Sequence, residues 1–216
     1  MQSYRLKSNV RACIDGAILV FLDLRRDRYR AVPVESAPRI AGLTEGAGHA
    51  SVSEASLLAL DLIEAAGDQT DPIALQRRRA PERKLVLEGG HRPTTRELAS
   101  FWAACVWTAH MLRLRRLDQA LASLSHRKAL AGVGASSAEK AAGLFEHLRP
   151  WYPRRRICLF DSLALMRFML DHGVAPTLVL GVRTAPFAAH CWVEMNDALV
   201  SDMSDHCASF TPIAWV

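Results

Sequence analysis

The stretch from Cys158 to Asp202 constrains the fold of this chain more than any other part of the sequence. Apolar residues follow Cys158 at helical spacing, which predicts a helix that begins at this cysteine and ends at Gly173. Residues 177–182 form a buried-looking apolar strand, and residues 189–195, which contain His190, alternate as a second strand. A third predicted strand, residues 199–203, contains Asp202. Helices and strands mixed in this way predict the α+β class.

Cys158, His190 and Asp202 are the candidate catalytic residues. A thiol, an imidazole and a carboxylate in this order supply a nucleophile, its base and an orienting group. The first amides and the positive dipole end of a helix that starts at Cys158 favour the thiolate, and one such amide can stabilise an oxyanion. Each residue also has a simpler interpretation: a core cysteine, a core histidine and a turn cap. Asp205 could compete with Asp202 for the orienting role.

The loop after the second strand decides which face of the sheet Asp202 occupies. Alternation puts His190 on one face and Cys191 on the other. A two-residue loop at Asn196-Asp197 would put Asp202 on the face of Cys191, whereas a three-residue loop would put it on the face of His190. If Asp202 orients His190, the sequence predicts an odd loop or a bulge at this turn.

Two helices and a linker are predicted before this unit. Thr94 or Thr95 can cap a long helix whose apolar stripe continues to Leu117, and residues 137–148 form a second helix that Pro150 ends. Prolines and glycines among charged residues mark the stretch before Thr94 as the best linker, which we assign to residues 81–93.

The first 80 residues predict a separate domain of three strands followed by three helices, a winged-helix pattern. The strands are expected at residues 4–13, 17–24 and 29–34, with a hairpin turn at Asp15-Gly16 and with Pro33 indicating a sheet edge. The helices are expected around residues 37–43, 51–66 and 72–79; the second has a capping box at Ser51 to Glu54 and an apolar stripe through Ile63.

Composition and charge limit the class of protein. Half of the 216 residues are hydrophobic, and 12 glycines with 10 prolines are too few for a chain disordered throughout. Much of the net charge of +5 lies in short arginine runs such as residues 77–79 and 154–156, typical of solvated surface; an acidic peptide or nucleic acid is the alternative. Nucleic acid is not expected, because no predicted helix interleaves basic and amide side chains for base readout.

The cysteines and the first residues indicate a cytoplasmic protein. Five cysteines have no framework-like spacing, and His206 with Cys207 fits no metal-ligand template, so neither a metal nor a cofactor is expected. No signal-peptide core follows Met1, and no run of about 18 apolar residues suggests a membrane span.

The second half resembles a known family. Its matching elements are Cys158-Leu159 with residues 162–165, Gly181-Val182, and His190 followed by residues 192–194. His190 follows Cys158 by 32 residues and Asp202 follows His190 by 12. These residues resemble the cysteine-peptidase domain of lasso-peptide maturation proteases, a branch of the transglutaminase-like and papain-like fold. The resemblance covers roughly residues 95–216 and is strongest over residues 155–203, and the predicted peptidase domain is residues 94–216. Two positions depart from the family: Cys191 replaces a usual alanine, and Asn196-Asp197 replaces a commoner Asp-Gly.

The first part resembles the PqqD-like peptide-recognition domain, through residues 20–24 followed by Arg28-Tyr29. In that family a leader peptide adds a strand beside the third strand. The resemblance implies that the peptide-binding residues are Tyr29, Arg30, Ala31, Val32 and Val34.

Together the two resemblances imply a cysteine endopeptidase that cuts the leader from a lasso-peptide precursor. Its implied partners are that precursor and an asparagine-synthetase-like cyclase, which closes the macrolactam. Two other classes stay open: an acyl transferase with the same three catalytic residues, and a non-catalytic carrier of the precursor. A winged-helix domain without a ligand, or one that binds DNA, is the alternative for the first part.

Overall fold

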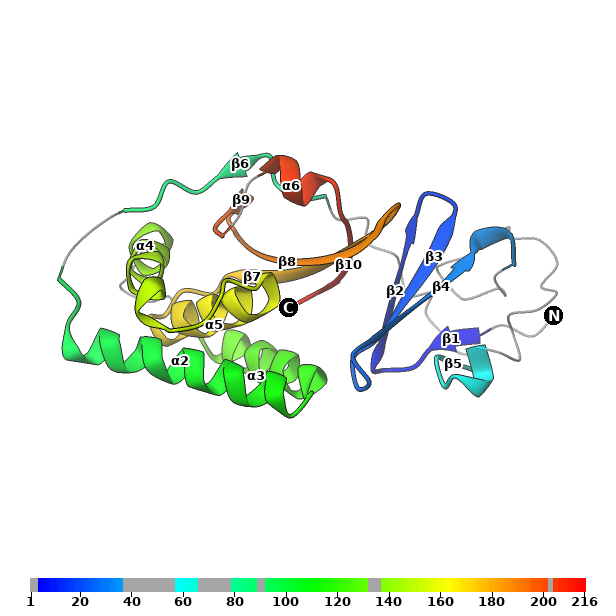
Figure 1. The fold of residues 1–216 in the computed structure, drawn as a ribbon, viewed down its shortest axis with the longest axis horizontal. Helices are drawn as coiled ribbons and strands as arrows, with labels where there is room; N and C mark the ends of the chain where they lie inside the picture. The colour runs from blue at the N-terminus through cyan, green and yellow to red at the C-terminus, as the bar shows by residue number, and fades with distance from the viewer. Residues whose placement is uncertain (1–3, 37–56, 66–78, 89–91, 132–136, 202–203) are drawn as a thin grey trace.

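The computed structural model describes residues 4–36, 57–65, 79–88, 92–131, 137–201 and 204–216. Within them, a small sheet near the N-terminus lies beside a larger unit of helices packed on a second sheet (Figure 1). The predicted α+β class is confirmed.

The N-terminal sheet is an antiparallel meander of β2 (Val10–Asp15), β3 (Ile18–Asp23) and β4 (Arg28–Pro33). Its first hairpin turns at Asp15-Gly16 as predicted, with Gly16 at a φ of 59°, where glycine is favoured. β4 pairs with β3 alone among the described strands, so the edge position that Pro33 predicted is confirmed. A 3₁₀ turn, η1 (Val34–Ser36), follows β4.

The strand predicted over residues 4–13 is wrong as a single element. It is divided into β1 (Tyr4–Leu6) and β2 by a tight turn in which Val10 N–H donates to the Lys7 carbonyl at 2.8 Å. β1 lies outside the meander and pairs antiparallel with β5 (Ile63–Ala65) in a separate two-stranded sheet.

The end of the helix predicted over residues 51–66 is also wrong. A helical turn spans residues 57–59, but Asp61 has a φ of 64° and the chain then enters β5. Pairing with β1 and burial of Leu62 and Ile63 against the meander outweigh the helical periodicity. The helices expected at 37–43 and 72–79, and the capping box at 51–54, lie outside the described residues except for Arg79.

The second unit has a five-stranded sheet with the order β10-β7-β8-β9-β6. Its strands are β6 (Arg83–Lys84), β7 (Thr177–Thr184), β8 (Phe187–Met195), β9 (Ala198–Leu199) and β10 (Thr211–Trp215). Its helices are α2 (Thr95–Arg113), α3 (Leu117–Leu130), α4 (Ala138–Leu148), α5 (Cys158–Asp171) and α6 (Ser204–Ala208), with a 3₁₀ turn, η2 (Arg149–Trp151), after α4. α5 packs directly on β8 and β7. None of the helices in the described residues is long and apolar enough to cross a membrane.

Side-chain caps fix the starts of α2 and α4 as predicted. Thr94 and Glu97 form a capping box at α2, and Ser137 caps α4. The predicted continuation of α2 to Leu117 is wrong, because the helix ends at Arg113 and Arg115 has a φ of 52°. Leu117 instead starts α3, a helix that the sequence interpretation missed.

The end of the expected linker packs on the second unit. β6 pairs in parallel with β9, and Leu85 N–H donates to the Leu199 carbonyl at 2.7 Å. Leu85 and Leu87 contact the core between α2, α4 and α5. Gly143 on α4 permits this approach, since a Cβ there would collide with the Glu88 carbonyl.

The N-terminal sheet and the second unit share one apolar cluster. Side chains of β2 and β3 pack with side chains of α3, α5, β7, β8 and β10; among them are Cys13, Val20, Leu121, Leu180 and Ile213. Asp15, at the hairpin turn, accepts hydrogen bonds from Thr184 N–H at 2.8 Å, Thr184 Oγ1 at 2.6 Å and Thr211 Oγ1 at 2.8 Å. These contacts fix the meander against β7 and β10.

Candidate active site

The start of α5 lacks an ordinary cap. Its N-cap residue, Ile157, has no side-chain acceptor, so no capping side chain bonds to the first-turn amides. The backbone of Ile157 is held instead by Asp161, whose Oδ2 accepts its N–H at 3.0 Å. Cys158 follows immediately and is half-buried, whereas the other four cysteines are buried. The thiol therefore sits beside amides that no capping side chain occupies.

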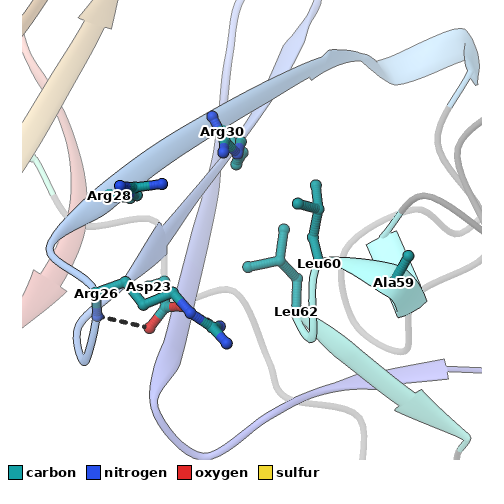
Figure 2. Close-up of a pocket in the computed structure, with 7 residues that line it drawn as sticks. All are labelled: Asp23, Arg26, Arg28, Arg30, Ala59, Leu60 and Leu62. Carbon is teal, nitrogen blue, oxygen red and sulfur yellow. Dashed lines mark hydrogen bonds and ion pairs between the residues drawn. The ribbon is translucent and has the colours of Figure 1, made fainter.

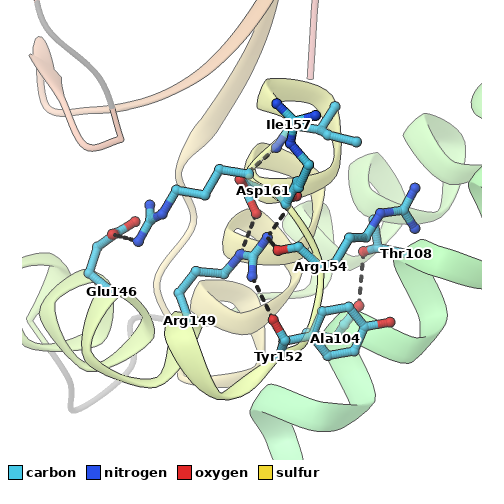
Figure 3. Close-up of polar contacts among 10 residues, drawn as sticks. Ala104, Thr108, Glu146, Arg149, Tyr152, Arg154, Ile157 and Asp161 are labelled. Atoms are coloured by element: carbon cyan, nitrogen blue, oxygen red, sulfur yellow. Dashed lines mark hydrogen bonds and ion pairs between the residues drawn. The ribbon is translucent and has the colours of Figure 1, made fainter.

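A buried arginine fixes the segment that leads into Cys158 (Figure 3). The Arg149 side chain is 2% exposed, and its Nε lies 2.5 Å from Asp161 Oδ1. Its other nitrogens donate to the carbonyls of Tyr152 at 3.1 Å, Arg154 at 3.2 Å and Arg155 at 3.4 Å. One guanidinium thus ties the chain on both sides of the candidate nucleophile, a role that no sequence pattern indicated.

The arginine run before Cys158 makes its contacts around this segment. Arg154 lies over the Phe160 ring, 4.8 Å from its centroid, and Arg156 pairs with Glu146 at 2.9 Å. Arg155 is exposed. Two of the three arginines therefore make specific contacts, whereas composition alone predicted a solvated surface for the whole run.

His190 lies on β8 opposite Gly181 of β7, in a group of aromatic side chains. Ring centroids of His206, Phe210 and Trp192 lie 4.5, 5.1 and 5.9 Å from that of His190. Trp192 Nε1 donates to Glu194 Oε1 at 2.7 Å, so these residues share one face, as the alternation predicted. A Cβ at Gly181 would come within 2.7 Å of Trp192 ring atoms, so this strand position needs glycine.

The opposite face of β8 packs on α5. Cys191 contacts the cluster that includes Leu163 and Met166, and Val193 contacts the cluster that includes Phe160. His190 therefore points away from the face that α5 covers.

The edge of β8 that β9 leaves open is where α5 contacts this strand. Val200 N–H donates to the Val193 carbonyl at 2.8 Å, but Val193 N–H donates to Ser201 Oγ at 3.1 Å, which ends the ladder. The Cys191 carbonyl points to this same edge, because alternate residues of a strand do so. It accepts Ser162 Oγ of α5 at 2.9 Å.

This hydrogen bond places the first turns of α5 at the open edge. Cys158 is four residues before Ser162 and thus on the same helix face. Cys158 therefore belongs to the helix on one face of β8, whereas the His190 side chain extends from the other face.

Asp202 lies outside the described residues. The turn before it has two residues, Asn196 and Asp197, with φ values of 49° and 57°, and Met195 pairs with Ala198. The odd loop considered from the sequence is therefore not formed. Because the ladder ends at Ser201, the register of this hairpin does not determine the face of residue 202.

Cys158 is less buried than the other four cysteines. Burial disfavours the thiolate form of a cysteine. Burial raises the pKa of Cys13 and of Cys105 to about 12 in each case, and it also raises the pKa of Cys191. These three thiols are therefore protonated near neutral pH. Cys191, one residue from His190, acts as a core residue of the α5 face.

The expected peptide-binding strand, β4, lies near this site through Tyr29. Its ring meets Phe187, at the start of β8, edge to face with centroids 5.5 Å apart. Arg30 and Val32 lie on the opposite face of β4, Ala31 is exposed, and Val34 is in η1. The backbone edge of β4 has no partner strand among those described.

Comparison with known proteins identifies the family. A family model described as the transglutaminase-like superfamily matches residues 100–215, more than half of the chain. The chain belongs to the transglutaminase-like superfamily. The predicted resemblance to this fold is confirmed, and the helix start and strands of the candidate site lie within the match.

A processing protein is also similar over a short stretch. The chain is 42% identical to the microcin J25-processing protein McjB of Escherichia coli over 45 residues, 21% of this chain. The match spans about a fifth of McjB, 22% of its length. No solved structure matches this transglutaminase-like chain. The PqqD-like assignment of the first part stays a prediction.

Proposed function

We propose that this chain is a cysteine protease that binds the leader of a lasso-peptide precursor and cleaves it from the core peptide. The main support is that the start of α5, with Cys158, meets the open edge of β8, which holds His190. Superfamily membership and the similarity to a microcin-processing protein favour the same function. Cleavage would free the core N-terminus for a partner, an asparagine-synthetase-like cyclase, which would close the macrolactam.

In the proposed reaction, His190 carries the proton in every step. His190 removes the proton of the Cys158 thiol, and the sulfur attacks the scissile carbonyl. The C–N bond breaks as His190 returns the proton to the leaving amine, which leaves a thioester on Cys158. His190 then deprotonates a water, whose oxygen attacks the thioester, and the proton returns to the sulfur. Asp202 is proposed to orient His190, and the contact between ring and thiol is expected to tighten when substrate binds.

The uncapped start of α5 supports an oxyanion site. A helix usually gains an acceptor from its N-cap side chain, but Ile157 offers none. The free first-turn amides and the positive end of the helix dipole favour an anion at this point. A tetrahedral intermediate on Cys158 would place its oxygen there, at a gain of about 3 kcal/mol per donor in well-studied hydrolases.

Leader docking would give the protease its selectivity. The edge of β4, which pairs with no other described strand, is proposed to take the leader as an added strand, along Tyr29, Arg30, Ala31, Val32 and the adjoining Val34. A docked leader raises the local concentration of one peptide bond to roughly millimolar. Removing the leader should therefore reduce cleavage far more than changing core residues distant from the cut.

Mass spectrometry of the precursor tests the proposal. The substrate would be the product of the short reading frame that we expect beside this gene, together with a cyclase gene. The wild-type chain should cut one bond and add one water across the two fragments, whereas Cys158→Ala and His190→Ala should cut none. An added amine in place of water would show an acyl transferase. Unchanged delivery to the cyclase by Cys158→Ala, without cleavage by the wild type, would show a carrier.

A further inference from the structure

The two faces of β4 have different surroundings. Tyr29 faces the second unit, where it meets Phe187, while Arg28 and Arg30 lie on the opposite face. On that face, Arg28 and Arg30 lie opposite the helical turn of residues 57–59 and the residues that follow it (Figure 2). A peptide strand added to β4 would direct alternate side chains into this space.

The space is a pocket of about 190 Å³. Its lining combines arginines of β4 and its preceding turn with an apolar wall: Asp23, Arg26, Arg28, Arg30, Ala59, Leu60 and Leu62. Leu60 is 41% exposed and supplies aliphatic surface to this lining. The pocket therefore offers positive charge on one side and aliphatic surface on the other.

The positive charge is only partly compensated. Arg26 pairs with Asp23 at 2.9 Å and lies 3.9 Å from Asp61. Arg28 and Arg30 are exposed and form no ion pair with any residue that the structure describes. Two guanidinium groups on one strand face thus lie open beside Leu60. Guanidinium groups bind carboxylates with paired, charge-assisted hydrogen bonds.

We propose that this pocket selects an acidic side chain in the extended peptide that pairs with β4, with an aliphatic residue two positions away. Side chains two apart on a strand lie roughly 6–7 Å from one another on the same face, which lets one reach the arginines while the other covers Leu60. The inference rests on the proposed function in taking that peptide to be a leader, and it adds the chemistry by which the leader is chosen.

The test is a binding experiment that needs no cleavage. A displayed library of random 12-residue peptides is selected on the full chain with Cys158→Ala. The strongest binder, and its counterpart with the acidic residue changed to the amide, are then labelled with fluorescein. Anisotropy gives their affinities for three proteins: the selection protein, a form that also has Arg28→Gln and Arg30→Gln, and a control with Arg92→Gln and Arg96→Gln. The control loses the same charge at exposed positions on and before α2.

Selected peptides should share an acidic position with an aliphatic residue two away. The β4 double variant should bind the acidic peptide at least about tenfold more weakly, the loss expected for charge-assisted hydrogen bonds. It should bind the amide peptide as the parent does, and the control should match the parent. Peptides without an acidic position, equal binding by the β4 variant, or an equal loss in the control would overturn the inference. The inference would also be overturned if the library gave no binders while a dT20 oligonucleotide bound the parent and not the β4 double variant, because the arginines would then serve nucleic acid.

The two proposals can fail separately. Binding of acidic peptides that depends on Arg28 and Arg30, with no cleavage of precursor, would refute only the protease. Precursor cleavage with an unchanged rate in the β4 double variant would refute only the acidic selection.

Discussion

Removing Arg149 should destabilise the chain more than any change at an exposed arginine. Its side chain is 2% exposed and that of its partner Asp161 is 16% exposed, so the pair is largely shielded from water. Loss of one partner from a buried pair costs about 3–5 kcal/mol, because a charge stays buried without compensation. Arg149→Met would also leave three backbone carbonyls without this donor. We expect a decrease of about 4 kcal/mol in the free energy of unfolding.

Asp161→Asn should cost about 3 kcal/mol, the lower end of the range for a broken buried pair, because Arg149 keeps its three carbonyl acceptors and an amide oxygen can still accept the Ile157 N–H. The double variant should lose less than the sum of the two single losses, since each single change breaks the same contact. Urea unfolding at pH 7, followed by tryptophan fluorescence, gives the three values. Precursor cleavage by the folded fraction of Asp161→Asn then reports on the placement of Cys158.

Arg156→Met is the matched control. Its ion pair with Glu146 has side chains 58% and 31% exposed, and such pairs contribute about 0–1 kcal/mol. If Arg149→Met and Arg156→Met shift the urea midpoint equally, or if the losses at Arg149 and Asp161 simply add, the argument from burial is refuted.

Three further outcomes are expected. Gly181→Ala should lower the thermal midpoint, at a cost of about 1–3 kcal/mol, because the new methyl would overlap the Trp192 ring; an unchanged midpoint would contradict that packing. Burial alone would raise the pKa of Asp15, but hydrogen bonds from two threonines outweigh it and lower that pKa below its ordinary 3.8. The carboxylate therefore adds stability above pH 3.8 that is lost as pH falls through the lower folded value, and Asp15→Asn should remove this part of the acid dependence of unfolding midpoints. Iodoacetamide at pH 7.5 should label Cys158 first in the folded chain, because burial raises the pKa of Cys191; peptide mapping that found Cys191 modified first would refute this order.

Local chemistry made several elements predictable. The capping box of Thr94 and Glu97, and the turn at Gly16, depend on residues adjacent in sequence, so their patterns are visible there. β5 was missed because Ile63 has helical spacing and becomes a strand only by pairing with Leu6, more than fifty residues earlier. Such long-range pairing leaves no trace in a short window.

The candidate site was predictable in its residue types but not in its arrangement. The position of Cys158 at a helix start follows from the apolar spacing after it. The role of Arg149 does not, because its partners are backbone carbonyls and an aspartate in the next helix. Whether Asp202 reaches His190 could not be read from the loop either, since a serine hydroxyl replaces the strand ladder one residue earlier.

The contacts of the meander with β7 and β10 fix the distance between the proposed docking strand and the candidate nucleophile. With Asp15 bonded to both strands and one core shared between the units, the span from the edge of β4 to the thiol of Cys158 is constant. If a leader docks on β4 as proposed, it must cover that span with a set number of residues. The position of the cut would then be counted from the docking point, and residues inserted between the two would move it along the substrate.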